Sequence, residues 1–236
     1  LKGVHKVYKL GKVEVPALKG IDLAIYPGEF AVIAGPSGSG KTTLLNLVGC
    51  VDVATRGTVM VDGHDTATLS ESKLTRLRLD RLGFIFQSFN LVGVLDAFDN
   101  VEFPLLLQGR LTKGERRKRV EAIMDSVGLS QTMHHRPNEL SGGQRQRVAI
   151  ARALVTQPRI VMADEPTANL DSKTGYQIID VMKRLNQDQG TTFIFSTHDP
   201  KVMSHADRSI ELIDGKISMA SVADDGRLDV PQSALV

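Results

Sequence analysis

The segment Gly35–Thr42, GPSGSGKT, follows the pattern G-x-x-x-x-G-K-[ST]. Glycines let backbone N–H groups close around phosphate oxygens, and the start of the following helix adds a partial positive charge. In this pattern the Lys41 ammonium reaches the β and γ phosphates of a nucleotide, and the Thr42 hydroxyl coordinates Mg²⁺. The predicted nucleotide-binding residues here are Gly35, Pro36, Ser37, Gly38, Ser39, Gly40, Lys41, Thr42 and Thr43.

A second group of polar residues follows the apolar run RIVMADE, which ends at Asp164 and Glu165. Taken alone, a strand that ends in Asp-Glu is more often an exposed turn. Together with a phosphate loop, Asp164 can hold Mg²⁺ through a water and bind the nucleotide. Glu165 can orient or deprotonate the attacking water, and general base catalysis is worth about a hundred- to ten-thousandfold in rate.

The segment Leu140–Leu154, LSGGQRQRVAIARAL, places two glycines and a serine at the start of a second predicted helix. Ser141 can cap that helix, and the amides of Gly142 and Gly143 together with the helix dipole form a second anion cradle. The chain therefore carries two candidate phosphate sites. The alternative is a glycine-rich helix entry that binds no ligand.

The surrounding sequence predicts the strands and helices that position these residues. The expected strands are Val4–Leu10, Gly20–Tyr26, Phe30–Ala34, Leu82–Gln87, Arg159–Asp164 and Thr191–Thr197. The expected helices outside the 96–155 region are Gly40–Cys50, Ser70–Leu79 and Ser172–Gln189. Asp-Gly pairs at 62–63 and 214–215 predict two hairpins.

Alternating strands and helices favour an α/β fold with a mostly parallel, helix-covered sheet, here a phosphate-loop NTPase core with an antiparallel β subdomain. Residues 96–155 show helical periodicity and almost no strand pattern, which predicts an inserted α-helical subdomain. The expected boundaries within one domain, 1–236, are a core of 1–87 and 158–218, a helical subdomain of 88–157, and a flexible tail of 219–236.

The composition excludes several classes of protein. A net charge of +2, from 29 basic and 27 acidic residues, gives no strong field toward polyanions, so no nucleic acid partner is expected. The basic run Lys113–Arg119 is expected to be the solvated face of a helix. The single cysteine, Cys50, excludes an internal disulfide and is expected to pack in the core. The sequence contains no apolar run of the roughly 18 to 20 residues that a spanning helix needs, and we expect no secretory signal.

These motifs together resemble the ATP-binding subunit of an ABC transporter, over nearly the whole chain. In that family LSGGQ, here Leu140–Gln144, is the signature motif. The resemblance implies that Ser141, Gly142, Gly143 and Gln144 close on the γ-phosphate of an ATP held by the phosphate loop of a second copy of the chain. Two chains related by a two-fold axis would then make two complete sites.

The resemblance assigns further residues one at a time. Gln87 corresponds to the glutamine that touches Mg²⁺ or the water and links the core to the helical subdomain. Asp171, in NLD, belongs to the D-loop that crosses the dimer interface, and His198 corresponds to the switch histidine that bonds the γ-phosphate. Tyr8 lies where the family stacks an aromatic ring on adenine, although a strand tyrosine packing on a neighbour is the ordinary alternative.

Several phrases narrow the resemblance, among them VPALKGIDLAIYPGEF, LVGCVD and ADEPTANLD. They are similar to ATPases of the bacterial lipoprotein-releasing, macrolide-export and cell-division group. The resemblance implies a peripheral location on the cytoplasmic face of the inner membrane and an integral membrane permease as partner. The permease's coupling helix would dock near Phe89–Leu95. Export or extrusion of a lipoprotein, peptide or macrolide is the expected use of ATP hydrolysis.

Other functions remain as alternatives. The same motor could serve a mechanical or regulatory membrane complex that transports nothing. Soluble ABC proteins that act on DNA split the cassette with a long coiled coil, and translation factors carry two cassettes, and neither feature is present in this sequence. A small kinase or GTPase is disfavoured by LSGGQ and by the lack of an N-K-x-D motif.

Overall fold

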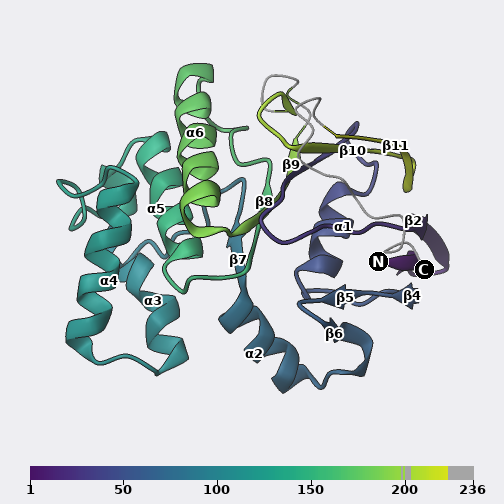
Figure 1. The fold of residues 1–236 in the computed structure, drawn as a ribbon, viewed down its shortest axis with the longest axis horizontal. Coiled ribbons are helices and arrows are strands. Elements are labelled where there is room, and N and C mark those ends of the chain that lie inside the picture. The colour runs from purple at the N-terminus through teal and green to yellow at the C-terminus, as the bar shows by residue number, and fades with distance from the viewer. Residues whose placement is uncertain (198, 200–202, 223–236) are drawn as a thin grey trace.

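A computed structural model describes residues 1–197, 199 and 203–222. The strands are β1 (Lys2–Leu10), β2 (Val13–Ile21), β3 (Phe30–Ala34), β4 (Arg56–Thr58), β5 (Met60–Val61), β6 (His64–Asp65), β7 (Leu82–Ile85), β8 (Ile160–Asp164), β9 (Thr192–Thr197), β10 (Arg208–Ile213) and β11 (Lys216–Val222). The α-helices are α1 (Lys41–Val48), α2 (Glu71–Arg81), α3 (Ala97–Gln108), α4 (Lys113–Ser126), α5 (Gly142–Leu154) and α6 (Ser172–Gln189), with short 3₁₀ turns at Thr66–Thr68 and Pro137–Glu139. Helices α3, α4 and α5 gather at one end of the molecule, and the small antiparallel strands lie at the other (Figure 1).

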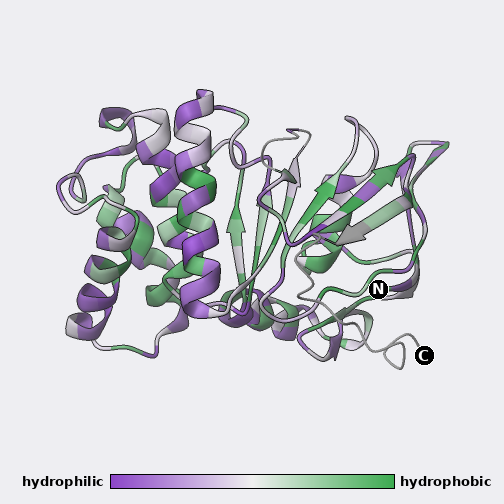
Figure 2. Ribbon diagram, turned by 45° about the horizontal axis from the view of Figure 1, so that its top comes forward, coloured by the Kyte–Doolittle hydropathy of each residue, from purple (hydrophilic) through white to green (hydrophobic). Residues whose placement is uncertain are grey.

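A six-stranded sheet in the order β11-β10-β3-β9-β8-β7 forms the centre, and all of its pairs are parallel except the β10–β11 hairpin. Its inner strands are largely hydrophobic in sequence (Figure 2), as expected of strands covered on both faces. Phe30 on β3 contacts Phe193 and Phe195 on β9, with ring centroids 5.6 and 4.8 Å apart. This parallel arrangement brings the carboxyl ends of β3, β8 and β9 to one edge, and confirms the predicted fold class.

Both ends of helix α6 are set by local sequence signals. Gly175, Ile178, Met182 and Leu185 are buried at helical spacing, so one face of α6 packs on the sheet. The Asp171 side chain caps its first turn, and Gly190, with φ of 64°, ends it in the left-handed region. The predicted range Ser172–Gln189 is confirmed.

The N-terminal strands contain a correction. The expected strand Gly20–Tyr26 is wrong beyond Ile21, because the structure has β2 at Val13–Ile21 and no strand at residues 22–26. Pro16 argues against a central strand, but β2 is an edge strand in the sheet β2-β1-β4, where a missing N–H is tolerated. The structure thus confirms an antiparallel β subdomain that is built partly from a different segment.

Smaller differences occur at other boundaries. Strand β7 ends at Ile85, so Gln87 lies in the following turn and not in the strand. Both predicted hairpins form, with Val61 paired to His64 and Ile213 paired to Lys216. Strand β11 continues to Val222, into the segment expected as a tail, and residues 223–236 lie outside the described part of the chain.

The region 96–155 is helical as predicted, with α3, α4 and α5 separated by turns. The basic run begins α4, where most of its side chains are exposed and Arg117 pairs with Glu121 at 2.8 Å. Cys50 is buried in the core, as expected. Among the described residues, every helix is too short or too polar to be a candidate membrane span.

Candidate functional site

The phosphate loop connects β3 to α1 and requires glycine at its tightest points. A Cβ atom at Gly35 would collide with the Leu212 carbonyl oxygen, and one at Gly40 would lie 2.7 Å from the Ala17 carbonyl oxygen. Both glycines also have positive φ, 150° and 107°. The Lys41 ammonium donates to the carbonyls of Gly35 and Pro36 at 2.8 and 2.9 Å, so it curls back over the loop.

Two of the three predicted metal-binding residues, Thr42 and Asp164, meet beside this loop. The Thr42 hydroxyl donates to Asp164 Oδ2 at 3.0 Å, and the Ser196 hydroxyl donates to Asp164 Oδ1 at 2.5 Å. Asp164 ends β8 next to Ser196 on β9, and β9 in turn pairs with β3, which leads into the loop. The parallel sheet therefore places one carboxylate at the first turn of α1, although the two are far apart in sequence.

Glu165 follows Asp164 with φ of 46°, in the left-handed region that side chains other than glycine seldom adopt. Its backbone N–H donates to the Ser196 carbonyl oxygen at 3.2 Å. Strained backbone of this kind clusters at functional sites, where the surrounding structure holds it in place. The turn directs the chain away from β8 immediately after the Asp164 carboxylate.

The donor set at Thr42 and Asp164 suits Mg²⁺, a hard cation that binds oxygen ligands through one or two protein groups and keeps several waters. Within the described ranges there is no cluster of three or more His, Cys, Asp or Glu side chains that could hold a metal alone. A Mg²⁺ ion held by Thr42 and Asp164 would take its remaining ligands from phosphate oxygens and water.

The second glycine-rich segment begins α5 and forms a complete capping box. The Gln144 N–H donates to Ser141 Oγ at 3.2 Å, and the Ser141 N–H donates to Gln144 Oε1 at 2.8 Å. The first turns of α1 and α5 contain no acidic residue, whereas α4 carries Glu115 in its first turn. The positive ends of α1 and α5 are thus left without a compensating carboxylate in their first turns.

The start of α5 packs against the segment that leads into α6. A Cβ atom at Gly143 would lie 2.5 Å from Thr174 Cγ2, and one at Gly142 would lie 3.4 Å from Leu170 Cδ2. Hydrogen bonds from the Thr174 side chain and N–H lower the pKa of the Asp171 carboxyl. None of the hydrogen bonds among the described residues joins Ser141–Gln144 to the phosphate loop.

The chain resembles known proteins over most of its length. The family model described as "ABC transporter" matches residues 18–168. A macrolide export ATP-binding/permease protein from Wolinella succinogenes is 49% identical over 218 residues, covering 92% of this chain and 34% of that protein. An uncharacterized ABC transporter ATP-binding protein from Methanocaldococcus jannaschii, MJ0796, is 48% identical over 220 residues, with 92% and 94% covered.

The chain belongs to the ABC transporter family. A solved dimeric structure of MJ0796, in a post-hydrolysis state bound to ADP and Pi, matches it with a TM-score of 0.87 and 46% identity, covering 94% of this chain and 97% of the other. The chain is therefore an ABC ATPase cassette. It spans about a third of the length of the macrolide export relatives that it matches.

In this ABC ATPase the turn after β7 is held from several sides. The Asn169 side chain donates to the Gln87 carbonyl oxygen at 2.8 Å. Arg152 on α5 donates to the carbonyls of Phe89 and Asn90 at 2.7 and 2.6 Å, and burial lowers the pKa of its guanidinium. The Arg145 guanidinium lies over the Phe89 ring, 5.2 Å from its centroid. The loop that carries Gln87 is thus tied both to α5 and to the segment that leads into α6.

Tyr8 lies on β1 with its ring half-buried beside the phosphate-loop helix. Its hydroxyl donates to Asp52 Oδ2 at 3.0 Å, and the Lys6 ammonium lies 4.9 Å from the ring centroid. Burial raises the pKa of the Tyr8 hydroxyl, an effect that the nearby Thr43 side chain partly opposes. The packing alternative and the adenine-stacking role both agree with this placement.

Two residues complete the comparison with the sequence. His198, expected as the switch histidine, lies outside the described residues. Ser196 was missed, although a serine in the otherwise apolar strand FIFST is a signal: it is fully buried and holds Asp164. Because a buried polar side chain normally has a hydrogen-bond partner, a serine in this apolar strand predicts a polar partner nearby.

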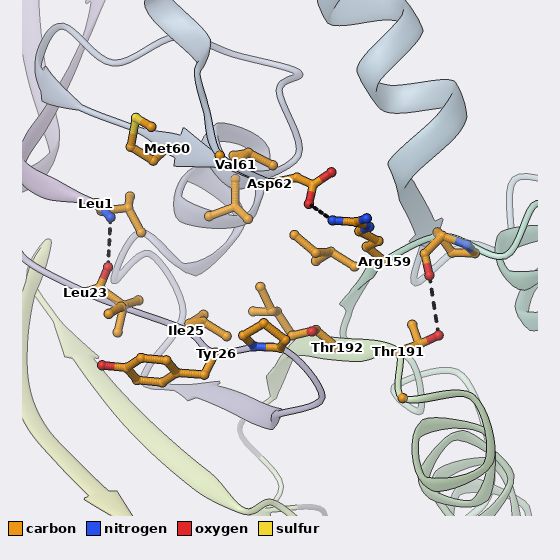
Figure 3. A pocket seen from close by; sticks show the side chains of 18 of the residues that line it. Leu1, Leu23, Ile25, Tyr26, Met60, Val61, Asp62, Arg159, Thr191 and Thr192 are labelled. Carbon is orange, nitrogen blue, oxygen red and sulfur yellow. Dashed lines mark hydrogen bonds and ion pairs between the residues drawn. The ribbon is translucent and has the colours of Figure 1, made fainter. Parts of the chain in front are cut away.

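A hollow lined by residues at the amino-terminal ends of the strands is shown in Figure 3. Its volume is about 1430 Å³, and its lining includes Ile160, Thr192 and Arg208, the first residues of β8, β9 and β10. Ligands of parallel sheets bind at the carboxyl ends of the strands. This rule favours the phosphate loop over this hollow as the nucleotide site.

Proposed function

We propose that two copies of the chain close around two ATP molecules, each bound by the phosphate loop of one copy and the signature segment of the other. The observation that carries the proposal is the start of α5. Ser141 caps the helix with an oxygen that only accepts there, so the hydroxyl proton is left to donate. This cradle packs against the D-loop of its own chain, and among the described residues it makes no hydrogen bond to that chain's phosphate loop. The solved MJ0796 cassette is a dimer bound to ADP and Pi, which supports a phosphate loop supplied by a partner.

Within each site the residues take distinct roles. Lys41 moves from the loop carbonyls to the β and γ phosphates, and the backbone N–H groups of residues 35–43, other than Pro36, surround them. Thr42 and Asp164 would hold Mg²⁺, which would neutralise charge that develops on the phosphates. Glu165 orients and deprotonates the attacking water, and Gln87 contacts the Mg²⁺ or the water. From the partner chain come Ser141, Gly142, Gly143, Gln144 and Asp171.

We further propose that the cassette drives an integral membrane permease from the cytoplasmic face of the inner membrane. The macrolide export relatives are named as combined ATP-binding/permease proteins, so the cassette of those proteins works beside a permease. On this chain several large apolar side chains are exposed near Gln87 and on α3: Phe86, Val92, Val94, Phe103, Leu106 and Leu107. Exposed apolar side chains that gather in one region are typical of a surface that binds another protein. Export or extrusion from the membrane is the proposed use of the work.

The dimer is tested by sedimentation of the Glu165→Gln variant with and without MgATP. Because the variant binds ATP without turning it over, we expect a shift from monomer to dimer that needs both nucleotide and metal. Adding Ser141→Arg to the variant should abolish the shift while leaving ATP binding to the monomer unchanged. A monomer at every protein concentration, with ATP bound, would contradict the proposed sandwich.

The permease surface is tested separately, with the tagged Glu165→Gln chain and MgATP in detergent-solubilised native membranes. We expect capture of a permease, identified by mass spectrometry, and its loss in the Val94→Asp variant, because the Val94 side chain is 80% exposed in the proposed surface. Met219→Asp is the matched control, since Met219 is 64% exposed on β11, outside that surface. Equal capture by both variants would contradict the assignment of the docking surface.

A further inference from the structure

A three-residue cluster next to the phosphate loop is not explained by catalysis. Asp52 follows α1, and its two carboxylate oxygens bond different partners on β1: Oδ1 accepts from the Lys6 ammonium at 2.6 Å and Oδ2 accepts from the Tyr8 hydroxyl at 3.0 Å. Lys6 is only 9% exposed, and its ammonium also donates to the Val53 carbonyl oxygen at 2.9 Å. Burying a charged lysine costs free energy unless the ammonium is paired, so the bonds to Asp52 and Val53 hold Lys6 in this position.

The turn that carries Asp52 is fixed to the phosphate-loop helix. The backbone N–H groups of Val51 and Asp52 both donate to the Asn46 carbonyl oxygen, at 2.9 and 3.2 Å. Cys50 adopts a positive φ of 56°, and its buried side chain anchors the same turn. The position of the Asp52 carboxylate therefore follows α1, the helix whose first turn faces the phosphates.

The Tyr8 ring is held in place at its hydroxyl and on one face. Its hydroxyl meets Asp52 and lies close to the Thr43 side chain in the first turn of α1. The Lys6 ammonium covers one face of the ring, 4.9 Å from the centroid, in a cation–π contact. A flat ligand can therefore stack only on the opposite face, and it would then lie beside the start of α1.

The charge state of Asp52 keeps this arrangement formed. Burial alone would raise the pKa of the Asp52 carboxyl, but hydrogen bonds from Lys6, the Val53 N–H and Tyr8 outweigh it and lower the pKa. The carboxylate is thus ionised at neutral pH and accepts from both side chains at once.

We propose that Asp52 is a positioning residue for the nucleotide base, which holds the Tyr8 ring at a fixed place relative to the phosphate-loop helix. Preorganising the ring lowers the entropy cost of stacking, so Asp52 increases affinity for the adenine and leaves affinity for the phosphates unchanged. The inference rests on the proposed function, together with the adenine-stacking role that the family resemblance gives Tyr8. It adds a residue that touches neither the base nor the phosphates.

The test compares a ligand with a base and one without it, MgADP and Mg-pyrophosphate, by isothermal titration calorimetry. Tyr8→Ala should weaken MgADP binding about 5- to 150-fold, the range of base–aromatic stacking. Asp52→Ala should weaken it about three- to tenfold, the cost of ordering one side chain on binding. Pyrophosphate affinity should stay unchanged in both. In the Tyr8→Ala background, Asp52→Ala should add nothing further, because the two residues act through one contact.

Two variants control for structural damage. Tyr8→Phe keeps the ring and the Lys6–Asp52 pair and removes only the hydroxyl, so it should weaken MgADP as Asp52→Ala does even if that variant folds poorly. Glu14→Ala removes another carboxylate of the β subdomain, one that pairs with Lys9 in an exposed position at 3.9 Å, and should change neither affinity.

The outcomes separate the inference from the proposed function. Equal weakening of both ligands by Asp52→Ala, or an added loss in the Tyr8→Ala background, would show that Asp52 acts through the phosphate loop and would overturn the inference. A loss in Tyr8→Ala alone, with Tyr8→Phe and Asp52→Ala at wild-type affinity, would overturn it while sparing the stacking role. Wild-type affinity in Tyr8→Ala would refute both.

Discussion

The capping box at the start of α5 gives a prediction in which stability and activity separate. Ser141→Ala removes a cap whose oxygen accepts from the Gln144 N–H at 3.2 Å. Loss of such a cap costs about 1 kcal/mol, which lowers the melting temperature of a chain of this size by about 2–4 °C. Against a total stability of about 5–15 kcal/mol the variant stays folded.

The expected loss of activity is larger than the loss of stability. A hydrogen bond from a hydroxyl to a charged phosphate is worth about 1.5–3 kcal/mol, so its removal should lower ATP turnover about 10- to 150-fold. Turnover is measured by release of inorganic phosphate at saturating MgATP, and stability by thermal unfolding of the same preparation.

Helix α4 supplies the matched control. Thr112 caps it in the same geometry, with its oxygen accepting from the Glu115 N–H at 3.4 Å and its N–H donating to Glu115 Oε2 at 2.7 Å. Thr112→Ala should cost a similar amount of stability and leave turnover unchanged. If both variants lose turnover in proportion to stability, Ser141 is only a helix cap and the reasoning about a second phosphate cradle is wrong.

Two further predictions concern the structure around the site. Asn100, 1% exposed, accepts from the Val92 N–H at 2.8 Å and donates to the carbonyls of Val92, Leu95 and Asp96. Asn100→Ala should lower the free energy of unfolding by about 2–4 kcal/mol in urea denaturation, because buried backbone groups lose their partners. A loss below about 0.5 kcal/mol would mean that water replaces the amide. For Cys50, burial raises the pKa of the thiol to about 11, only partly offset by Arg78. Because the thiolate is the nucleophile, iodoacetamide at pH 8 should label the folded chain about 100-fold more slowly than the urea-unfolded chain. Equal rates would place Cys50 at the surface.

The features predicted best from sequence are those encoded locally. The phosphate loop, the hairpins at 62–63 and 214–215 and the helix Ser172–Gln189 each depend on a few neighbouring residues whose types allow one backbone conformation. The strand expected at Gly20–Tyr26 is wrong beyond Ile21, because the true strand is Val13–Ile21, which contains Pro16. Only the sheet order shows that this strand lies at an edge, where proline is tolerated.

The supporting contacts of the site could not be predicted in the same way. Ser196 bonds Asp164 across two strands, and Arg152 bonds the Phe89 carbonyl from a helix more than sixty residues later in the chain. Neither partner carries a local signal of the pairing, because each bond depends on how the sheet and the helical subdomain come together. The residues that act on the nucleotide belong to short motifs, whereas those that hold them in place are distributed over the fold.

The central claim is that each ATP site combines the phosphate loop of one chain with the signature segment of another, and mixing two inactive variants tests it most directly. Lys41→Ala disables the phosphate loop, and Ser141→Arg disables the signature segment. A mixed dimer would hold one site with both defects and one intact site. With statistical pairing and independent sites, an equimolar mixture should recover about a quarter of the wild-type ATP turnover. A mixture no more active than either variant alone, with mixed dimers demonstrated by differently tagged chains, would contradict the account.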